Sequence, residues 1–486
     1  TPAKLRLYSE LDRENRQKSE IYRDTSTLPS GLLYCPIKRR LIVKGLIGVA
    51  ASKTDQYPST SSPADAKAER VAQQVKKRMN LARRAAGLLL STVLLPLSAL
   101  AAEPQPTHEF RLDNGLKVIV REDHRAPVVV SQVWYKVGSS YETPGKTGLS
   151  HALEHMMFKG TPNVGAGEFS RRVAAAGGRD NAFTSKDYTA YFQQVPKAQL
   201  AQMMQLEADR MRHLNLDAGE FAQEIKIVME ERRQRTDDSP HARLGEQLQA
   251  VAYQTHPYRV PVIGWMNDLE NMTVQDARDW YRRWYAPNNA CVVVVGDVDH
   301  QAVFKLAQMY YGRVPARALP ARKTPDEPDQ TGIRRFTLRA EAELPMLIMA
   351  YKVPVLRDVE NDVDPYALEM LAAVLDGHDA ARLTTRLIRE QQLAVSASAS
   401  YDSLARGPGL FYLSGAPGEG KTRADLEAAL RAEIARIAED GVAPDELARA
   451  RAQLVAGQVY KLDSMFAQAM EIGQLEARSE EHTSEL

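Results

Sequence analysis

The sequence is poor in cysteine and carries almost no net charge, and each scarcity excludes a class of protein. Its 486 residues include two cysteines, Cys35 and Cys291, which are too few for a disulfide framework. Cys291 lies in an apolar run, so we expect it to be a buried thiol. The 63 basic and 62 acidic side chains leave a formal charge of +1, and no global field would attract nucleic acid. We therefore expect no nucleic-acid partner.

Long apolar runs are also scarce, which argues against a protein with several membrane spans. The run at residues 85–97 is shorter than the about 20 residues that a spanning helix needs. Two arginines precede this run and Ser98-Ala99-Leu100-Ala101 follows it, an arrangement typical of a cleaved secretory signal. We expect a signal peptide at residues 79–101, a periplasmic or secreted protein and no stable membrane span after cleavage. A membrane anchor is the alternative.

Both ends of the chain carry segments in which we expect no folded domain. Residues 1–78 precede Met79, the first methionine, and include a polar stretch at residues 59–63 that cannot bury a core. We interpret them as translated upstream sequence, with a true disordered extension as the alternative. Residues 478–486 resemble the conceptual translation of a sequencing adapter, so we expect the gene fragment to end near Ala477.

Between these ends, strand and helix patterns alternate, which predicts an α+β fold. Period-two alternation predicts a hairpin around the Asp113-Asn114-Gly115 turn. Further strands are expected at 128–137, 182–195 and 333–338, and helices at 149–157, 200–212 and 220–235. A proline-rich stretch at residues 315–328 is a candidate linker.

The two sides of this linker resemble each other. Residues 214–225 and residues 441–450 each follow a predicted helix and open another, which indicates a duplicated domain. Chance similarity between amphipathic helices is the alternative. We expect a first half at 102–320, a linker at 321–332 and a homologous second half at 333–477 that is incomplete.

The chemistry of the chain is concentrated in one short motif, His151-Ala152-Leu153-Glu154-His155. In a helix, residues four apart lie on one face, so the two imidazoles can bind the same metal ion. Glu154 lies beside that face, where a carboxylate can act as general base toward a water molecule. The order H-x-x-E-H is the inverse of the thermolysin-type order.

A third ligand is needed, because catalytic zinc is commonly held by two histidines and a carboxylate with the fourth position left open. The predicted helix at 220–235 offers Glu224, Glu230 and Glu231. Periodicity alone does not choose among them, and a solvated helix face is the ordinary explanation for any one glutamate.

Three segments make the chain resemble the pitrilysin or insulinase family, M16, of zinc metallopeptidases. These segments are residues 112–116, 148–161 and 181–184, and the resemblance extends over residues 107–477. It is greatest to the short bacterial and mitochondrial-processing-peptidase-like branch. The resemblance implies one zinc ion per chain. It also implies that Glu231 is the third ligand, with Glu230 as the adjacent alternative, and that Glu224 supports the site through a hydrogen bond to a ligand.

The resemblance also implies a reaction and a mode of substrate binding. In the family, the strand that here bears Asn181 and Ala182 takes an extended peptide as an added strand; an ordinary sheet strand is the alternative. The expected function is a zinc endopeptidase that cleaves peptides or unfolded segments with Glu154 as general base. A non-catalytic scaffold or binding subunit of the same fold is the alternative.

The second half departs from the family's self-sufficient members. Ile388 and Val395 occupy the places of an Arg and a Tyr that hold substrate, and Arg389 is out of register. Gly457 stands where a counterpart of Glu231 would fall, and residues 377–381 lack the metal motif. We expect a metal-free second half and a heterodimer in which a separate, inactive paralogous M16 subunit supplies the missing Arg and Tyr.

A competing motif lies in the second half. Residues 415–422 match the phosphate-loop pattern G-x-x-x-x-G-K-[ST] between an expected strand and an expected helix. Pro417 removes one amide of the phosphate cradle, and no acidic strand end is available for magnesium. We interpret the match as accidental, and a nucleotide-dependent protein is the alternative.

Overall fold

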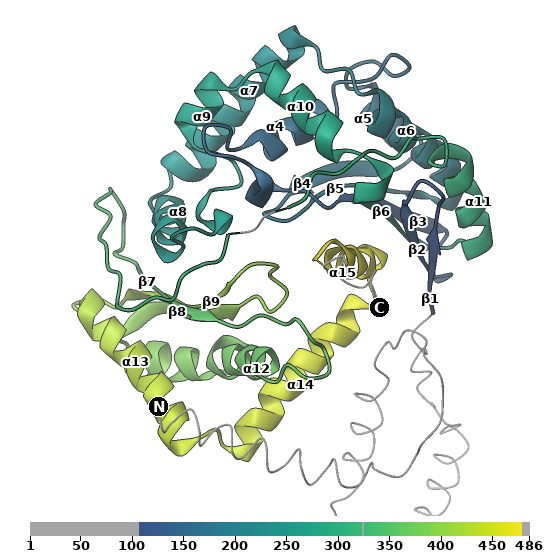
Figure 1. Cartoon of the computed structure of the whole chain (residues 1–486). Coiled ribbons are helices and arrows are strands. Elements are labelled where there is room, and N and C mark those ends of the chain that lie inside the picture. Colours follow the sequence, from purple (N-terminus) through teal and green to yellow (C-terminus); the bar gives the residue numbers. More distant parts are fainter. Residues whose placement is uncertain (1–105, 323–324, 479–486) are drawn as a thin grey trace, which may run out of the picture. The chain divides into compact units, whose positions relative to one another are not determined.

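The computed structural model describes residues 106–322 and 325–478 (Figure 1). The expected signal peptide at 79–101 and the segment at 1–78 lie outside the described residues, as do residues 479–486. In the described ranges, no helix combines the length and the apolar character that crossing a bilayer requires.

The first half is built on a six-stranded mixed sheet with the strand order β1-β2-β6-β3-β5-β4. Its strands are β1 (Thr107–Arg111), β2 (Lys117–Glu122), β3 (Val128–Tyr135), β4 (Arg179–Thr184), β5 (Thr189–Pro196) and β6 (Ala290–Gly296). β1 and β2 form the expected hairpin, whose turn contains Gly115 at φ +86°. β2 and β6 are parallel, and the other neighbours are antiparallel.

Both faces of this sheet are covered, and the apolar run of β6 reflects that. Val292 and Val294 pack on the helical side, whereas Val293 and Val295 pack on the other side. A strand buried on both faces reads as a continuous apolar run. Cys291 at its start is buried, as predicted.

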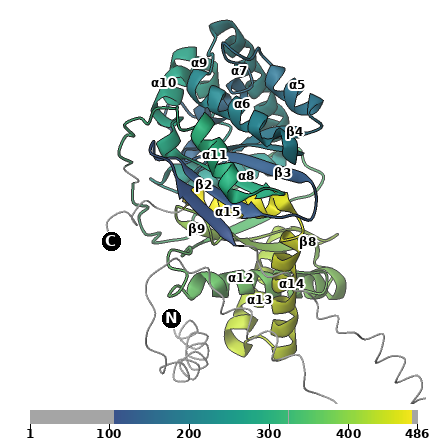
Figure 2. The same cartoon turned by 90° about the vertical axis from the view of Figure 1, so that its right-hand side faces the viewer.

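The helices α4, α5, α6, α7 and α10 lie on one face of the sheet (Figures 1 and 2). The helices of this half are α4 (Leu149–Met156), α5 (Glu168–Ala175), α6 (Leu200–His213), α7 (Ala218–Arg232), α8 (Pro240–Ala252), α9 (Met266–Asn271), α10 (Val274–Trp284) and α11 (His300–Tyr310). A π-helical segment at Arg233–Asp237 follows α7 directly.

The other face of the sheet is covered by the last helix, α15 (Met465–Arg478). Gly473 of this helix lies against the ring of Trp134, and an added Cβ would come within 2.0 Å of its Cε2 atom. Glu476 forms ion pairs with Lys117 at 2.7 Å and Lys136 at 3.0 Å. The end of the chain's second half therefore completes the core of the first half.

The second half contains a three-stranded sheet with the order β7-β9-β8. Its elements are β7 (Leu347–Val353), α12 (Asp364–Asp376), a π-helical segment at Leu383–Glu390, β8 (Ala394–Tyr401), β9 (Gly409–Pro417), α13 (Arg423–Asp440) and α14 (Pro444–Lys461). This order repeats β3-β5-β4, and α13 and α14 follow β9 as α6 and α7 follow β5. The predicted α+β fold with two homologous halves is confirmed.

Two strand predictions were wrong. Residues 333–338 form no strand, and the first strand of the second half is β7. A strand needs a neighbour for its amides and carbonyls, and no described strand pairs with this segment. The single strand expected at 182–195 is two strands, β4 and β5, separated by a turn that a 2.8 Å hydrogen bond from Ser185 N to Tyr188 O closes.

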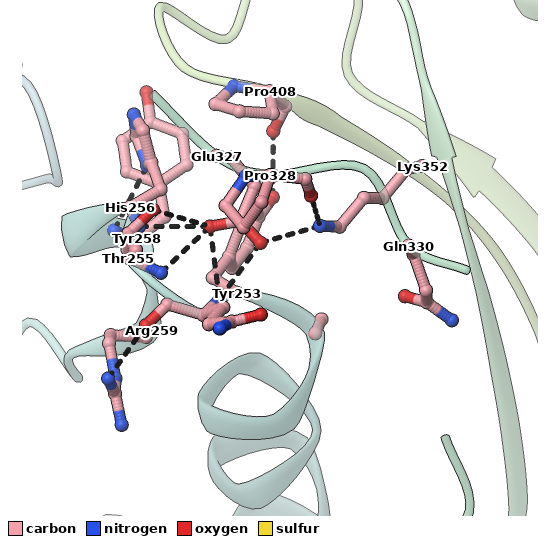
Figure 3. Close-up of polar contacts among 12 residues, drawn as sticks. Tyr253, Thr255, His256, Tyr258, Arg259, Glu327, Pro328, Gln330, Lys352 and Pro408 are labelled. Carbon is pink, nitrogen blue, oxygen red and sulfur yellow. Dashed lines mark hydrogen bonds and ion pairs between the residues drawn. The ribbon is translucent and has the colours of Figure 1, made fainter. Parts of the chain in front are cut away.

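The proline-rich stretch is anchored to both halves by Glu327 (Figure 3). Its carboxylate accepts hydrogen bonds of 2.9–3.0 Å from the main-chain amides of Gln254, Thr255 and His256, and Lys352 of β7 lies 2.6 Å away. Burial opposes ionisation, but the hydrogen bonds from Lys352 and the amides outweigh it and lower the pKa of Glu327 to about 2.

Candidate metal centre

The predicted metal motif lies on α4, with His151 and His155 one turn apart and their ring centroids 4.8 Å apart. The helix begins after Gly148, which has φ +87° and provides no side-chain cap. Glu142 replaces the cap, because its carboxylate accepts 2.7 Å hydrogen bonds from the amides of Gly148 and Ser150. The start of the motif helix is thereby held by a residue that precedes it in the chain.

Helix α7 brings the expected third ligand, Glu231, to the two imidazoles from far along the chain. Glu231 Oε2 lies 3.5 Å from His151 Nε2 and 3.5 Å from His155 Nε2. Zinc bonds of about 2.0–2.1 Å in tetrahedral geometry place ligand atoms about 3.4 Å apart. The three residues therefore fit one zinc ion, and they form one of two groups of converging metal-ligating side chains in the described residues.

The structure distinguishes the three glutamates that the sequence left open. Glu230 is 54% exposed and pairs with Arg233 at 3.1 Å, away from the imidazoles. Glu224 Oε2 lies 3.2 Å from His155 Nδ1, and its other oxygen binds Lys159. The tertiary arrangement thus places Glu231 beside both imidazoles and Glu224 behind His155.

The electrostatics of the site suit a metal. Burial, and then the neighbouring His155 and Arg235 side chains, lower the pKa of His151 to about 3. The ring is therefore neutral at pH 7, which is the form that coordinates metals. Its Nδ1 atom is buried without a hydrogen-bond partner among the described residues. Burial raises the pKa of Glu154, against a hydrogen bond that the Thr184 hydroxyl donates to its carboxylate.

Thr184 places the edge strand of the sheet beside this centre. It ends β4, the strand that also carries Asn181 and Ala182 and that pairs only with β5 among the described strands. Ala182 N donates a 2.9 Å hydrogen bond to the side-chain oxygen of Asn181. The outer edge of β4 therefore pairs with no other described strand, and Thr184 links this strand to Glu154.

Several supporting residues were missed in the sequence. Thr184 belongs to a segment that carried the family resemblance, but its bond to Glu154 depends on the packing of β4 against α4. Arg235 Nη1 lies 2.5 Å from Glu231 Oε1, and the i,i+4 spacing of the two residues was an available signal. Glu142 had no local signal, since it is neither in the helix nor at its cap position.

In the segment that matches the phosphate-loop pattern, polar groups already form hydrogen bonds with other groups of the protein. Thr422 caps α13, and the Asp425 carboxylate accepts hydrogen bonds from the Thr422 amide and hydroxyl. Gly418 N donates to Leu393 O at 2.7 Å. A carboxylate therefore occupies the helix start that a phosphate would need, which supports the interpretation of an accidental match.

The second half has no comparable metal centre in the part of the chain that the structure describes. Ile388 packs against its hydrophobic core, and Val395 is 51% exposed on β8. Neither side chain can replace a substrate-binding Arg or Tyr.

Comparison with known proteins identifies the family. The profile described as Insulinase (Peptidase family M16) matches residues 117–264, and the Peptidase M16 inactive domain matches residues 271–454. The zinc protease PqqE of Helicobacter pylori is 38% identical over 316 residues, which cover 63% of this chain and 70% of that protein. The chain belongs to peptidase family M16.

Solved structures of proteases share the fold of much of this chain. A protease from Helicobacter pylori matches with a TM-score of 0.70 and 30% identity over 77% of this chain and 90% of that one. The periplasmic protease PqqL from Escherichia coli matches with a TM-score of 0.66 and 20% identity over 77% of this chain and 43% of its own. The latter likeness concerns the fold alone.

Proposed function

We propose that this M16 protein is a zinc-dependent endopeptidase that hydrolyses peptides or unfolded polypeptide segments, with one catalytic zinc ion per chain. The observation that supports it is the meeting of His151, His155 and Glu231 at 3.5 Å spacings with Glu154 on the same helix. Relatives that are similar in sequence carry the name zinc protease. The inverted H-x-x-E-H motif thus supplies two ligands and the general base.

The roles of the residues follow from their positions. His151, His155 and Glu231 hold the zinc ion, which when bound acts as a Lewis acid toward the scissile carbonyl. Glu154 takes a proton from the attacking water at its carboxylate and gives it to the leaving amine nitrogen. The Thr184 hydroxyl orients that carboxylate, and Glu224 fixes the ring of His155 through Nδ1.

The substrate binds as an added strand on the edge of β4, next to Asn181 and Ala182. Main-chain hydrogen bonds provide affinity that depends little on sequence. The exposed edge of β4 and its link to Glu154 through Thr184 support this mode.

The catalytic half at 102–320 acts together with a metal-free half at 333–477 and with a separate inactive paralogous M16 subunit. Ile388 and Val395, which stand in place of a substrate-binding Arg and Tyr, support the need for that partner. The protein works in the periplasm or is secreted after cleavage of the signal peptide at 79–101, and the fold relative from Escherichia coli is named a periplasmic protease.

The decisive test compares the wild type with Glu154→Gln, using metal analysis and cleavage of a quenched peptide in the presence of the paralogous subunit. The amide keeps the shape of the side chain but cannot accept the proton, so the variant should bind zinc and lose turnover by ~10²–10⁴-fold. A wild type that binds zinc and cleaves nothing with its partner present would favour the scaffold alternative.

A further inference from the structure

A second cluster of metal-ligating side chains lies at the opposite edge of the six-stranded sheet from β4. It contains His108 of β1, Glu122 at the end of β2 and His300 at the start of α11, and their ligand atoms lie within 4.8 Å of one another. The proposed catalytic centre uses none of these residues. Residues far apart in the sequence, from 108 to 300, meet here because β2 and β6 are neighbours and α11 follows β6.

Glu122 is the centre of this cluster. Its Oε1 lies 2.7 Å from His300 Nδ1, and its Oε2 lies 3.5 Å from Nε2 of His124. The His108 ring stacks on the His300 ring with centroids 3.7 Å apart. Three imidazoles therefore surround one carboxylate.

The surroundings of His124 repeat the arrangement found at the first centre. Asp297 Oδ1 lies 2.7 Å from His124 Nδ1, and Lys197 holds the other oxygen of Asp297 at 2.6 Å. The remaining nitrogen of His124 faces Glu122 at 3.5 Å.

At the first centre, Lys159 holds Glu224 and Glu224 lies at Nδ1 of His155. The Nε2 atom of His155 then faces Glu231, also at 3.5 Å. A carboxylate on one imidazole nitrogen orients the ring and makes the other nitrogen a better metal ligand. The same order of lysine, carboxylate, imidazole and carboxylate therefore occurs twice in this chain.

We propose that Glu122, His300 and His108 bind a second divalent transition-metal ion, such as Zn²⁺, with His124 as a third imidazole at the other carboxylate oxygen. Imidazole and carboxylate ligands suit zinc, nickel and copper. The ion would tie the β1–β2 hairpin to α11. It is separate from the proposed catalytic ion and does not depend on peptidase activity.

This second site is less prepared for a metal than the first. The His108 and His300 rings are parallel within 4°, so their in-plane lone pairs do not converge until one ring turns. His108 lies on the edge strand β1 and is only partly buried, which leaves its ring room to rotate. Because this reorganisation costs affinity, we expect zinc to bind at least ~10-fold more weakly than at the first centre.

The test uses the full chain carrying His151→Ala and His155→Ala, so that the first centre no longer binds zinc. Calorimetric titration with Zn²⁺ should then find one remaining ion per chain. Adding His108→Ala and His300→Ala should weaken that binding by ~10–100-fold, and adding His124→Ala alone should weaken it less. Glu122 is left unchanged in these variants because it also accepts a 2.9 Å hydrogen bond from His300 N at the start of α11.

The matched control in the same background is His213→Ala. His213 is another partly exposed histidine whose Nδ1 lies 3.0 Å from an aspartate, Asp209, and its loss should leave the titration unchanged. Circular dichroism establishes that each variant is folded. The proposal is overturned if no zinc binds once His151 and His155 are replaced, or if the zinc affinity is unchanged after the loss of both His108 and His300.

Discussion

Arg232 Nη1 donates a 2.7 Å hydrogen bond to the main-chain oxygen of Gly264. Arg232 follows Glu231 in the chain, and Gly264 packs so closely against Gly148 that a Cβ on it would lie 2.6 Å from the Gly148 Cα atom. Gly148 in turn precedes α4. One hydrogen bond and one close contact therefore connect the end of the helix that carries Glu231 to the start of the helix that carries His151 and His155.

Arg232→Met should lower both stability and zinc affinity. The buried guanidinium also forms a two-pronged ion pair with Glu246 at 2.8 and 3.0 Å. Its removal would leave a carboxylate unpaired, at a cost of about 3 kcal/mol in the free energy of unfolding. Urea unfolding and zinc content measure the two effects. Arg233→Met is the control, because Arg233 is exposed and pairs only with exposed Glu230 among the contacts described, and it should change neither quantity.

Glu224→Gln should weaken zinc binding by ~10–100-fold without unfolding the protein, since the amide orients the His155 ring less well than a carboxylate does. Competition with a chelating dye measures the affinity. Glu220→Gln serves for comparison, because Glu220 lies on the same helix and contacts Lys159 only at 3.7 Å. Equal affinities in the two variants would mean that Glu224 does not support the site.

Glu327→Gln should make the free energy of unfolding less dependent on pH in the acid range. The pKa of Glu327 is lowered in the folded protein to about 2 from an ordinary value of 4.5, so its ionised form stabilises the fold above pH 4.5. That contribution, up to about 3 kcal/mol, is lost as the pH falls from 4.5 toward 2. The variant should be less stable than the wild type at pH 7, and the two should converge near pH 2. Urea unfolding across this range measures the difference, and a constant difference at every pH would contradict the assignment.

Gly473→Ala should destabilise the protein by about 1–3 kcal/mol, because the new methyl group would overlap the buried ring of Trp134. Gly457→Ala is the paired control within α14, where an added Cβ meets nothing within 4 Å. An alanine there should stabilise the helix by about 0.5–1 kcal/mol. Thermal unfolding compares the two, and opposite signs are expected.

The local part of the site could be predicted from sequence because helical periodicity is a short-range property. The four-residue spacing of His151 and His155 is enough to put both rings on one face, with Glu154 beside them. The duplication was also visible, since α6–α7 and α13–α14 repeat the same helix pair. The prediction of a strand at 333–338 was wrong because strand formation is not a short-range property. Residue preference favours an extended chain there, but only a neighbouring strand can satisfy its hydrogen bonds.

Tertiary structure alone decided what comes together from distant segments. The sequence by itself determined that the two imidazoles lie together with Glu154 beside them, and left Glu224, Glu230 and Glu231 as alternatives until the family resemblance favoured Glu231. The packing of α7 against α4 turns Glu231 toward the imidazoles and Glu230 toward solvent. The cap that Glu142 provides and the cluster around Glu122 had no signal in the sequence, because each depends on side chains that meet only after the sheet and its helices have packed.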